Sequence, residues 1–216
     1  MKTVGSYIKR VRALGWPFLL TGLAFLLGVI ALTQPVWSYE QATTGGNVDR
    51  WTYGWSVVTE EVWQNGVWAG TTVMPYSSPS FTESRMREAV TTSYSIAAVY
   101  VASLFVLALV QFIAKPRKIP QSLTFLVTLA ALALGIATAA YSAFAVPAAA
   151  GTDISSSISS LTGSVFVNGP GSNDYTLSWG AAAGWWMWAA SLALTAIVFI
   201  VPLLQRKPWA RASPAH

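Results

Sequence analysis

The sequence predicts an α-helical membrane protein, a left-handed bundle of four transmembrane helices with a small extracellular antiparallel β-sheet built from the two outer loops. Three observations predict this fold class. Of the 216 residues, 54% are hydrophobic and only 10% are charged, whereas a soluble domain carries roughly 25% charged residues. The charged residues leave four long neutral windows. The chain also has 11 tryptophans, and tryptophan collects at membrane–water interfaces.

Each neutral window is long enough for one transmembrane helix, which needs about 20 mostly apolar residues, and none is long enough for two. The windows cover residues 13–39, 89–114, 119–152 and 175–205. The helices expected within them cover residues 16–37, 93–114, 122–147 and 181–204. A signal peptide is the alternative for the first window. Its apolar stretch is longer than that of a usual signal peptide, however, and no small-residue cleavage site follows it.

The basic residues predict the orientation of the bundle. Ten of the 13 Lys and Arg residues lie in the N-terminal arm 1–15, the connection 115–121 and the tail 205–216, where no acidic residue occurs. All eight acidic residues lie in the loops 38–92 and 148–180. Because basic residues stay on the cytoplasmic side, we expect a multi-pass plasma membrane protein with both termini cytoplasmic. The expected topology anchors are Arg10, Arg12, Lys115, Arg117, Lys118, Arg206 and Lys207.

The first outer loop, 38–92, has the pattern of β-structure. Between residues 51 and 59, aromatic and β-branched side chains recur at every second position, which is the period of a strand. The Asn65-Gly66 pair tolerates the positive φ of a tight hairpin turn. Residues 67–73 supply the returning strand, and Pro75 ends it. The loop therefore predicts a hairpin that stands on the helices.

The second outer loop, 148–180, predicts another hairpin. The segments 164–167 and 175–178 flank the turn-forming sequence Asn168-Gly169-Pro170-Gly171, and their edge could extend the first sheet. The Ser-, Thr- and Gly-rich stretch 151–164 is expected to be loop.

Before the second span, Ser80-Phe81-Thr82-Glu83 fits a capping box. In this motif Ser80 is the N-cap and the Glu83 side chain bonds back to it. A helix that begins there runs through Arg85, Arg87 and Glu88 into the second span and projects above the membrane.

Three local motifs accompany this layout. Pro35-Val36-Trp37 ends the first span, Trp51-Thr52-Tyr53-Gly54-Trp55 follows it, and Arg85 and Arg87 precede the second span. The pattern resembles the claudin-like tetraspan superfamily of claudins, peripheral myelin protein and channel auxiliary subunits, which has a Pro-x-Trp, a Trp…Gly-Leu-Trp signature and an arginine at these places. The family's paired cysteines are absent, and no Leu separates Gly54 from Trp55. A cysteine-free version implies a prokaryotic relative or convergence.

The composition argues against catalysis and cofactors. The chain has no Cys, and its one His is the terminal His216, which excludes thiolate metal sites and nearly excludes haem axial pairs and His-based catalysis. The expected spans contain no charged residue, which argues against proton pumping or ion transport within one protomer. Glu60 and Glu61 could bind a cation, but neighbours on a strand point to opposite faces. We therefore expect no enzymatic activity, no cofactor and no metal.

Contact residues are expected in the loops and on the helices. Small residues at every fourth position allow close helix packing, and this spacing occurs twice. The stripe on the third span is Ala131, Gly135 and Ala139, and the pair that opens the fourth helix is Gly180 and Gly184. Trp185, Trp186 and Trp188 advance by about 100° per residue, so at least one faces lipid or a partner. The candidate interface residues are Trp51, Gly54, Trp55, Trp63, Trp68, Phe166, Gly180, Gly184, Trp185, Trp186 and Trp188.

These features predict a non-catalytic structural or auxiliary subunit of a larger membrane protein complex, which binds through its outer sheet and aromatic helix faces. One alternative is a claudin-like cell–cell adhesion or barrier protein that self-assembles in the membrane. Another is a cofactor-free accessory subunit of a membrane redox or transport enzyme. The expected partners are other integral membrane proteins, copies of the same chain, and lipid. The net charge of +5 reflects topology, so no nucleic-acid partner is expected.

Overall fold

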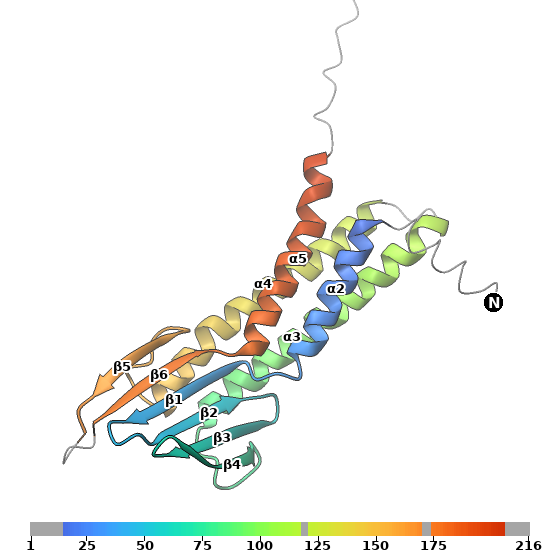
Figure 1. Cartoon of the computed structure of the whole chain (residues 1–216). Helices are drawn as coiled ribbons and strands as arrows, with labels where there is room; N and C mark the ends of the chain where they lie inside the picture. Colours follow the sequence, from blue (N-terminus) through green and yellow to red (C-terminus); the bar gives the residue numbers. More distant parts are fainter. Residues whose placement is uncertain (1–14, 118–120, 170–173, 206–216) are drawn as a thin grey trace, which may run out of the picture.

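The computed structural model describes residues 15–117, 121–169 and 174–205. In these residues the chain forms an elongated helix bundle with a six-stranded antiparallel sheet at one end (Figure 1). The helices of this part of the chain are α2 (Trp16–Ala31), α3 (Ser84–Arg117), α4 (Gln121–Asp153) and α5 (Ala183–Gln205). By length and composition, α3, α4 and α5 are able to cross a membrane. These three helices agree with the membrane protein that the sequence predicts.

The first helix is shorter than the predicted span 16–37. α2 has 16 residues and ends at Ala31. Pro35 lacks an amide hydrogen and disfavours a helical residue before it, so the chain turns and enters a strand at Trp37. At 1.5 Å per residue, α2 is about 24 Å long, less than the hydrocarbon core of a typical bilayer, which is about 30 Å.

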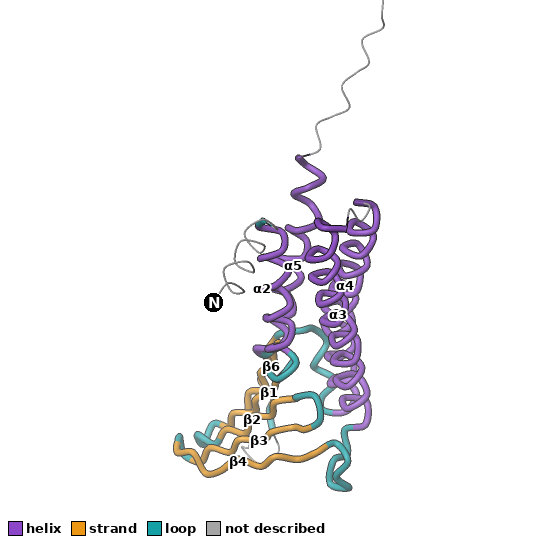
Figure 2. Tube along the Cα trace, turned by 90° about the vertical axis from the view of Figure 1, so that its right-hand side faces the viewer, coloured by secondary structure: helices purple, strands orange, loops and turns teal. Residues whose placement is uncertain are grey.

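At the sheet end, α3 continues beyond its span as the projecting helix that the sequence predicts, and α4 extends well beyond its predicted span. α3 begins at Ser84 and α4 continues to Asp153, so α4 includes the first residues of the expected loop 151–164. Figure 2 shows both helices reaching down beside the strands. The buried residues of these additional turns are Met86, Ala89, Val90, Ala149 and Ala150. Burial of this apolar surface against the sheet stabilises the additional turns.

The sheet joins the two outer loops. Its strands are β1 (Trp37–Thr43), β2 (Val48–Tyr53), β3 (Val57–Gln64), β4 (Val67–Pro75), β5 (Gly163–Val167) and β6 (Tyr175–Ala181). Their order is β4-β3-β2-β1-β6-β5, and β1 joins the two loops by pairing with both β2 and β6. The second-loop hairpin therefore extends the first-loop sheet, as the sequence predicts.

Two hairpin features of the sheet can be compared with the prediction. Asn65 and Gly66 both have positive φ, 51° and 76°, in the turn between β3 and β4, which confirms this hairpin. The alternation over 51–59 is not one strand, because Gly54 and the residues after it form a turn between β2 and β3. In that turn the Gly54 amide donates to the Val57 carbonyl at 2.9 Å.

Two predicted helix boundaries fall inside the sheet. Trp37 lies in β1 and not at the end of the first helix. Gly180 lies in β6, and α5 begins at Ala183, so Gly180 does not open the fourth helix. In both places the backbone groups bond to a neighbouring strand, because β1 and β6 pair along their whole length from Trp37–Ala181 to Thr43–Tyr175.

The larger of two hydrophobic clusters fills the junction between the sheet and the helices. Its largest fully buried side chains are Trp37, Tyr53, Tyr94, Met86 and Trp188. The smaller cluster lies within the bundle, around Tyr100, Leu104 and Leu107. The sheet is therefore packed onto the helices through a continuous core, which holds the inner face of the sheet against α3 and α4.

Candidate functional site at the sheet and its junction with the helices

Four aromatic side chains line the inner face of the sheet, which packs on the helices. In the register of β1 and β2, Trp37 lies opposite Tyr53 and Tyr39 opposite Trp51. Alternate residues of a strand point to the same face, so all four lie together. The rings of Tyr39 and Trp51 stack with centroids 4.5 Å apart, and the Trp37 indole donates to the Leu161 carbonyl at 3.3 Å. Trp51 is thus part of the intramolecular core and not a free contact residue.

A buried carboxyl group lies beneath this aromatic layer. The Tyr53 hydroxyl donates to Oε2 of Glu83. Burial raises the pKa of the Glu83 carboxyl; the Tyr53 hydrogen bond opposes this increase, and the charge of Asp153 adds to it. Burial is also the main reason why the pKa of the Tyr53 phenol is raised. The capping box is therefore wrong, because α3 begins at Ser84 and the Glu83 side chain holds the sheet.

A second carboxylate supplies the cap that the capping box does not provide. Oδ2 of Asp153, at the end of α4, accepts a hydrogen bond from the Met86 amide in the first turn of α3 at 2.8 Å.

A small cavity of about 100 Å³ lies between the sheet and the segment before α3, with Glu60 and Glu83 among its lining residues. Among the described residues, no group of three or more His, Asp and Glu side chains is placed to hold a metal ion. The arrangement braces the sheet against the helices.

The outer face of the sheet carries an ion-pair network at its centre. Arg50 on β2 lies 2.6 Å from Glu40 on β1 and 3.9 Å from Glu61 on β3. Glu60 lines the cavity on the inner face. The two neighbouring glutamates therefore point to opposite faces, which confirms the expected divergence and removes the paired cation site.

The loop residues of the predicted interface fall into three environments. Trp55 is 46% exposed, and its ring stacks on Tyr94 of α3 with centroids 5.8 Å apart. Gly54 lies in the β2–β3 turn, where its carbonyl accepts the Tyr76 hydroxyl at 2.8 Å. Trp63 and Trp68 lie opposite each other on β3 and β4 beside a bulge. Trp68 and Phe166 are the most exposed members of this set, each 56% accessible.

The three tryptophans of α5 differ in exposure, as their helical spacing predicts. Trp186 is 57% exposed, whereas Trp188 is 1% exposed and packs edge-on against Tyr94. Trp185 is half-buried, and within the described part of the chain the indole nitrogens of Trp185 and Trp188 have no hydrogen-bond partner. Only Trp186 presents a large open ring to the surroundings.

The small residues on the helices serve packing within this chain. A Cβ on Gly135 would lie 2.8 Å from Leu192 and 3.0 Å from Tyr100, so α4 approaches α3 and α5 closely at this point. Ala131 is fully buried and Ala139 is half-buried. A Cβ on Gly184 would lie 2.8 Å from the carbonyl oxygens of Gln34 and Pro35.

A buried hydroxyl network in the bundle has no counterpart in the sequence motifs. The Tyr100 hydroxyl lies 2.9 Å from those of Ser191 and Thr195, and Ser191 donates to the Ala24 carbonyl at 2.7 Å. The only sequence signal for this network is a serine and a threonine at helical spacing on α5. That spacing does not indicate which residue of another helix they contact. The network links α2, α3 and α5.

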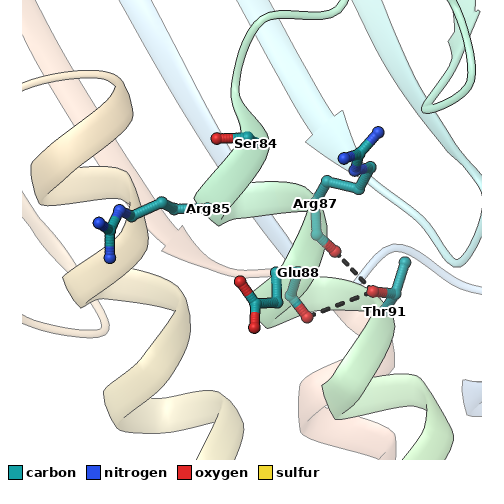
Figure 3. Close-up of a pocket in the computed structure, with 5 residues that line it drawn as sticks. All are labelled: Ser84, Arg85, Arg87, Glu88 and Thr91. Atoms are coloured by element: carbon teal, nitrogen blue, oxygen red, sulfur yellow. Dashed lines mark hydrogen bonds between the residues drawn. The ribbon is translucent and has the colours of Figure 1, made fainter.

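The structure also forms a surface pocket at the sheet end of α3, which Figure 3 shows in close-up. It is open, has a volume of about 600 Å³ and is lined by Ser84, Arg85, Arg87, Glu88 and Thr91. The two topology anchors that the structure describes lie at the other end of α3. Lys115 and Arg117 lie in the last turn of α3, whereas Arg10, Arg12, Lys118, Arg206 and Lys207 fall outside the described residues.

Comparison of the sequence with known protein families found no match, and a search of curated proteins found none either.

Proposed function

We propose that this protein is a non-catalytic structural or auxiliary subunit of a larger membrane protein complex, and that it recruits its partner through the sheet. The observation that carries the proposal is the edge strand β4. It is the last strand in the sheet order, so one row of its backbone amides and carbonyls has no neighbouring strand in the described part of the chain. Such an edge is a template for pairing with another chain.

The sequence of β4 favours strand addition. Its nine residues, Val67–Pro75, contain no charged side chain, whereas soluble proteins commonly protect an exposed edge with Lys or another charge. Val67, Trp68 and Val73 are 69%, 56% and 59% exposed. A strand of a partner protein that pairs with β4 would gain backbone hydrogen bonds and cover these apolar side chains.

Self-assembly of claudin-like type is the second candidate, and the opposite edge supports it. β5 ends the sheet on the other side and carries the exposed Phe166. An edge-to-edge contact between β4 of one copy and β5 of the next is heterologous and generates open arrays. The resemblance to the claudin-like superfamily, with a left-handed bundle and an extracellular sheet, belongs to this proposal.

We infer that the sheet lies outside the cell, that the protein resides in the plasma membrane and that both termini are cytoplasmic. The support is the charge distribution, because Lys115 and Arg117 lie at the end of α3 remote from the sheet, and basic residues favour the cytoplasmic side.

The test compares the two sheet edges. The protein is purified in mild detergent from native membranes as wild type, Val73→Lys on β4 and Phe166→Lys on β5. Both positions are exposed, so each lysine is compatible with folding, and a melting curve controls for this. Under the main proposal, Val73→Lys releases the co-purifying membrane protein and Phe166→Lys retains it.

The other outcomes are equally informative. Loss of self-association in both variants favours the claudin-like alternative over the auxiliary subunit. A wild-type protein that is a lone monomer with no stable partner contradicts both candidates.

A further inference from the structure

The pocket at the start of α3 contains charges of both signs. Arg85, Arg87 and Glu88 line it together with two hydroxyl side chains, those of Ser84 and Thr91. One arginine is anchored, because Nη1 of Arg87 donates to the Tyr76 carbonyl at 3.3 Å. Among the described residues Arg85 forms no ion pair. In Figure 3, Arg85 and Arg87 leave the helix on different sides, and Glu88 lies between them.

Two residues of this pocket lie on the same face of α3 as a stripe of exposed residues farther along the helix. Arg85 and Glu88 are followed at helical spacing by exposed residues along the same face. These residues are Ser95, Val99, Ala102, Val106 and Leu109. Val99 is 55% exposed, Val106 47% and Leu109 46%. In a helix that crosses a membrane, such a stripe contacts acyl chains.

The pocket lies at the water-facing edge of the lipid headgroup layer. Tyr94 lies level with the segment just after α2 and with the second turn of α5, because its hydroxyl donates to the Gln34 carbonyl and its ring packs on Trp188. At 1.5 Å per residue, Glu88 lies about 9 Å beyond Tyr94. The headgroup layer on each side of the hydrocarbon core is about 5–8 Å thick, so Glu88 lies just beyond it. A long arginine side chain extends to reach polar groups.

We propose that this pocket binds the headgroup of a phosphatidylethanolamine-type lipid, with its acyl chains along the α3 stripe. Arg85 holds the phosphate through charge-assisted hydrogen bonds, Glu88 accepts the primary ammonium, and Arg87 closes the other side. The pair of opposite charges matches a zwitterionic headgroup that has N–H donors. A choline headgroup has no N–H donor, and a glycerol headgroup has no cation. The Met86 amide is already bonded to Asp153, so the side chains and not the helix terminus form this site.

Native mass spectrometry of the full chain in detergent tests this assignment. The protein is equilibrated with an equimolar mixture of phosphatidylethanolamine, phosphatidylcholine and phosphatidylglycerol with identical acyl chains. An exposed ion pair contributes about 0.2–1 kcal/mol, so we expect a preference for phosphatidylethanolamine of about 1.4- to 5-fold. Glu88→Gln abolishes this preference, and Arg85→Gln lowers retention of all three lipids. The matched control is Glu61→Gln, on the outer face of the sheet, which retains the wild-type preference.

Three results would overturn the assignment. One is stronger retention of phosphatidylglycerol than of phosphatidylethanolamine, which would indicate an anionic-lipid site. Another is an unchanged lipid preference in Glu88→Gln, with a melting temperature equal to that of the wild type. The third is equally effective competition by soluble glycerophosphoethanolamine, which would show that the acyl stripe takes no part.

Discussion

The carboxylate of Asp153 at the end of α4 accepts a hydrogen bond from the backbone amide of Met86 in the first turn of α3. The two residues are 67 positions apart in the sequence, and their atoms are 2.8 Å apart. A negative charge at a helix N-terminus satisfies a free amide and complements the helix dipole. One long helix therefore caps the other at the level of the sheet.

Replacement of Asp153 tests this contact. Asp153→Ala leaves the Met86 amide without its acceptor, so we expect the free energy of unfolding to fall by about 1–2 kcal/mol. Asp153→Asn keeps an acceptor oxygen and is expected to lose less. Unfolding of both variants in detergent, followed by circular dichroism, checks the order. Equal stability of Asp153→Ala and the wild type would refute the cap.

The buried Glu83 predicts a pH dependence of stability. Its pKa is raised in the folded protein, so the folded state holds the proton more tightly than the unfolded chain. The stability contributed by this group is therefore present at low pH and is lost as the pH rises above the ordinary value of 4.5 and through the raised pKa.

Glu83→Gln isolates this effect, because glutamine stays neutral and still offers an oxygen to the Tyr53 hydroxyl. We expect the stability of the variant relative to wild type to increase from acid to neutral pH. Melting temperatures of the two proteins across a pH series measure the difference. A difference that is constant, or that shrinks as the pH rises, contradicts the raised pKa.

The close approach at Gly184 predicts that a single methyl group is harmful there. Its Cβ would lie 2.8 Å from two carbonyl oxygens, so Gly184→Ala must separate α5 from the end of α2. We expect a loss of about 1–3 kcal/mol in unfolding free energy. Gly22→Ala in α2 is the control, because a Cβ there meets nothing within 4 Å, and alanine favours a helix. If both substitutions have the same effect on the melting temperature, packing at Gly184 is not the cause.

The tryptophans predict a wide range of mutational effects. Trp37 is fully buried and Trp68 is 56% exposed. Trp37→Ala creates a cavity in the junction core and is expected to cost about 3–5 kcal/mol, whereas Trp68→Ala changes stability little. Thermal unfolding of the purified variants measures both, and a Trp68→Ala protein as unstable as Trp37→Ala would mean that β4 is buried.

The proposed orientation is testable because the chain contains no cysteine and thus gives no labelling background. Ser164→Cys on β5 and Ser213→Cys in the tail are treated with a membrane-impermeant maleimide in intact cells. Cysteine at position 164 is expected to react at once, and cysteine at position 213 only after lysis. The reverse pattern would place the sheet on the cytoplasmic side.

The helix regions and one hairpin were predictable because their signals are local. Long neutral windows mark apolar helices, and the Asn65-Gly66 turn specifies a β3–β4 hairpin through positive φ values that few residue types accept. Pro35 also carried a local signal for the end of α2, but the apolar run around it was included in the predicted helix. The strand β1 was missed for this reason.

The candidate site could not be predicted in the same way, because it depends on contacts between residues that are far apart in the sequence. The Ala-rich segment that ends α4 is stabilised as a helix by the burial of Ala149 and Ala150 in the junction core, and the Glu83 carboxylate of the expected capping box instead accepts the Tyr53 hydroxyl. Both outcomes depend on residues far away in the chain.

Composition and charge spacing predicted an apolar helical membrane protein, because both reflect the transfer of side chains between water and lipid. Side-chain alternation and the Asn65-Gly66 turn predicted β-structure in the loops. Only the tertiary structure decided where the helices end, which acids cap and brace them, and which sheet edge is left open. The reason is that these features depend on pairing and burial between distant segments, whose free energy no single stretch of sequence contains.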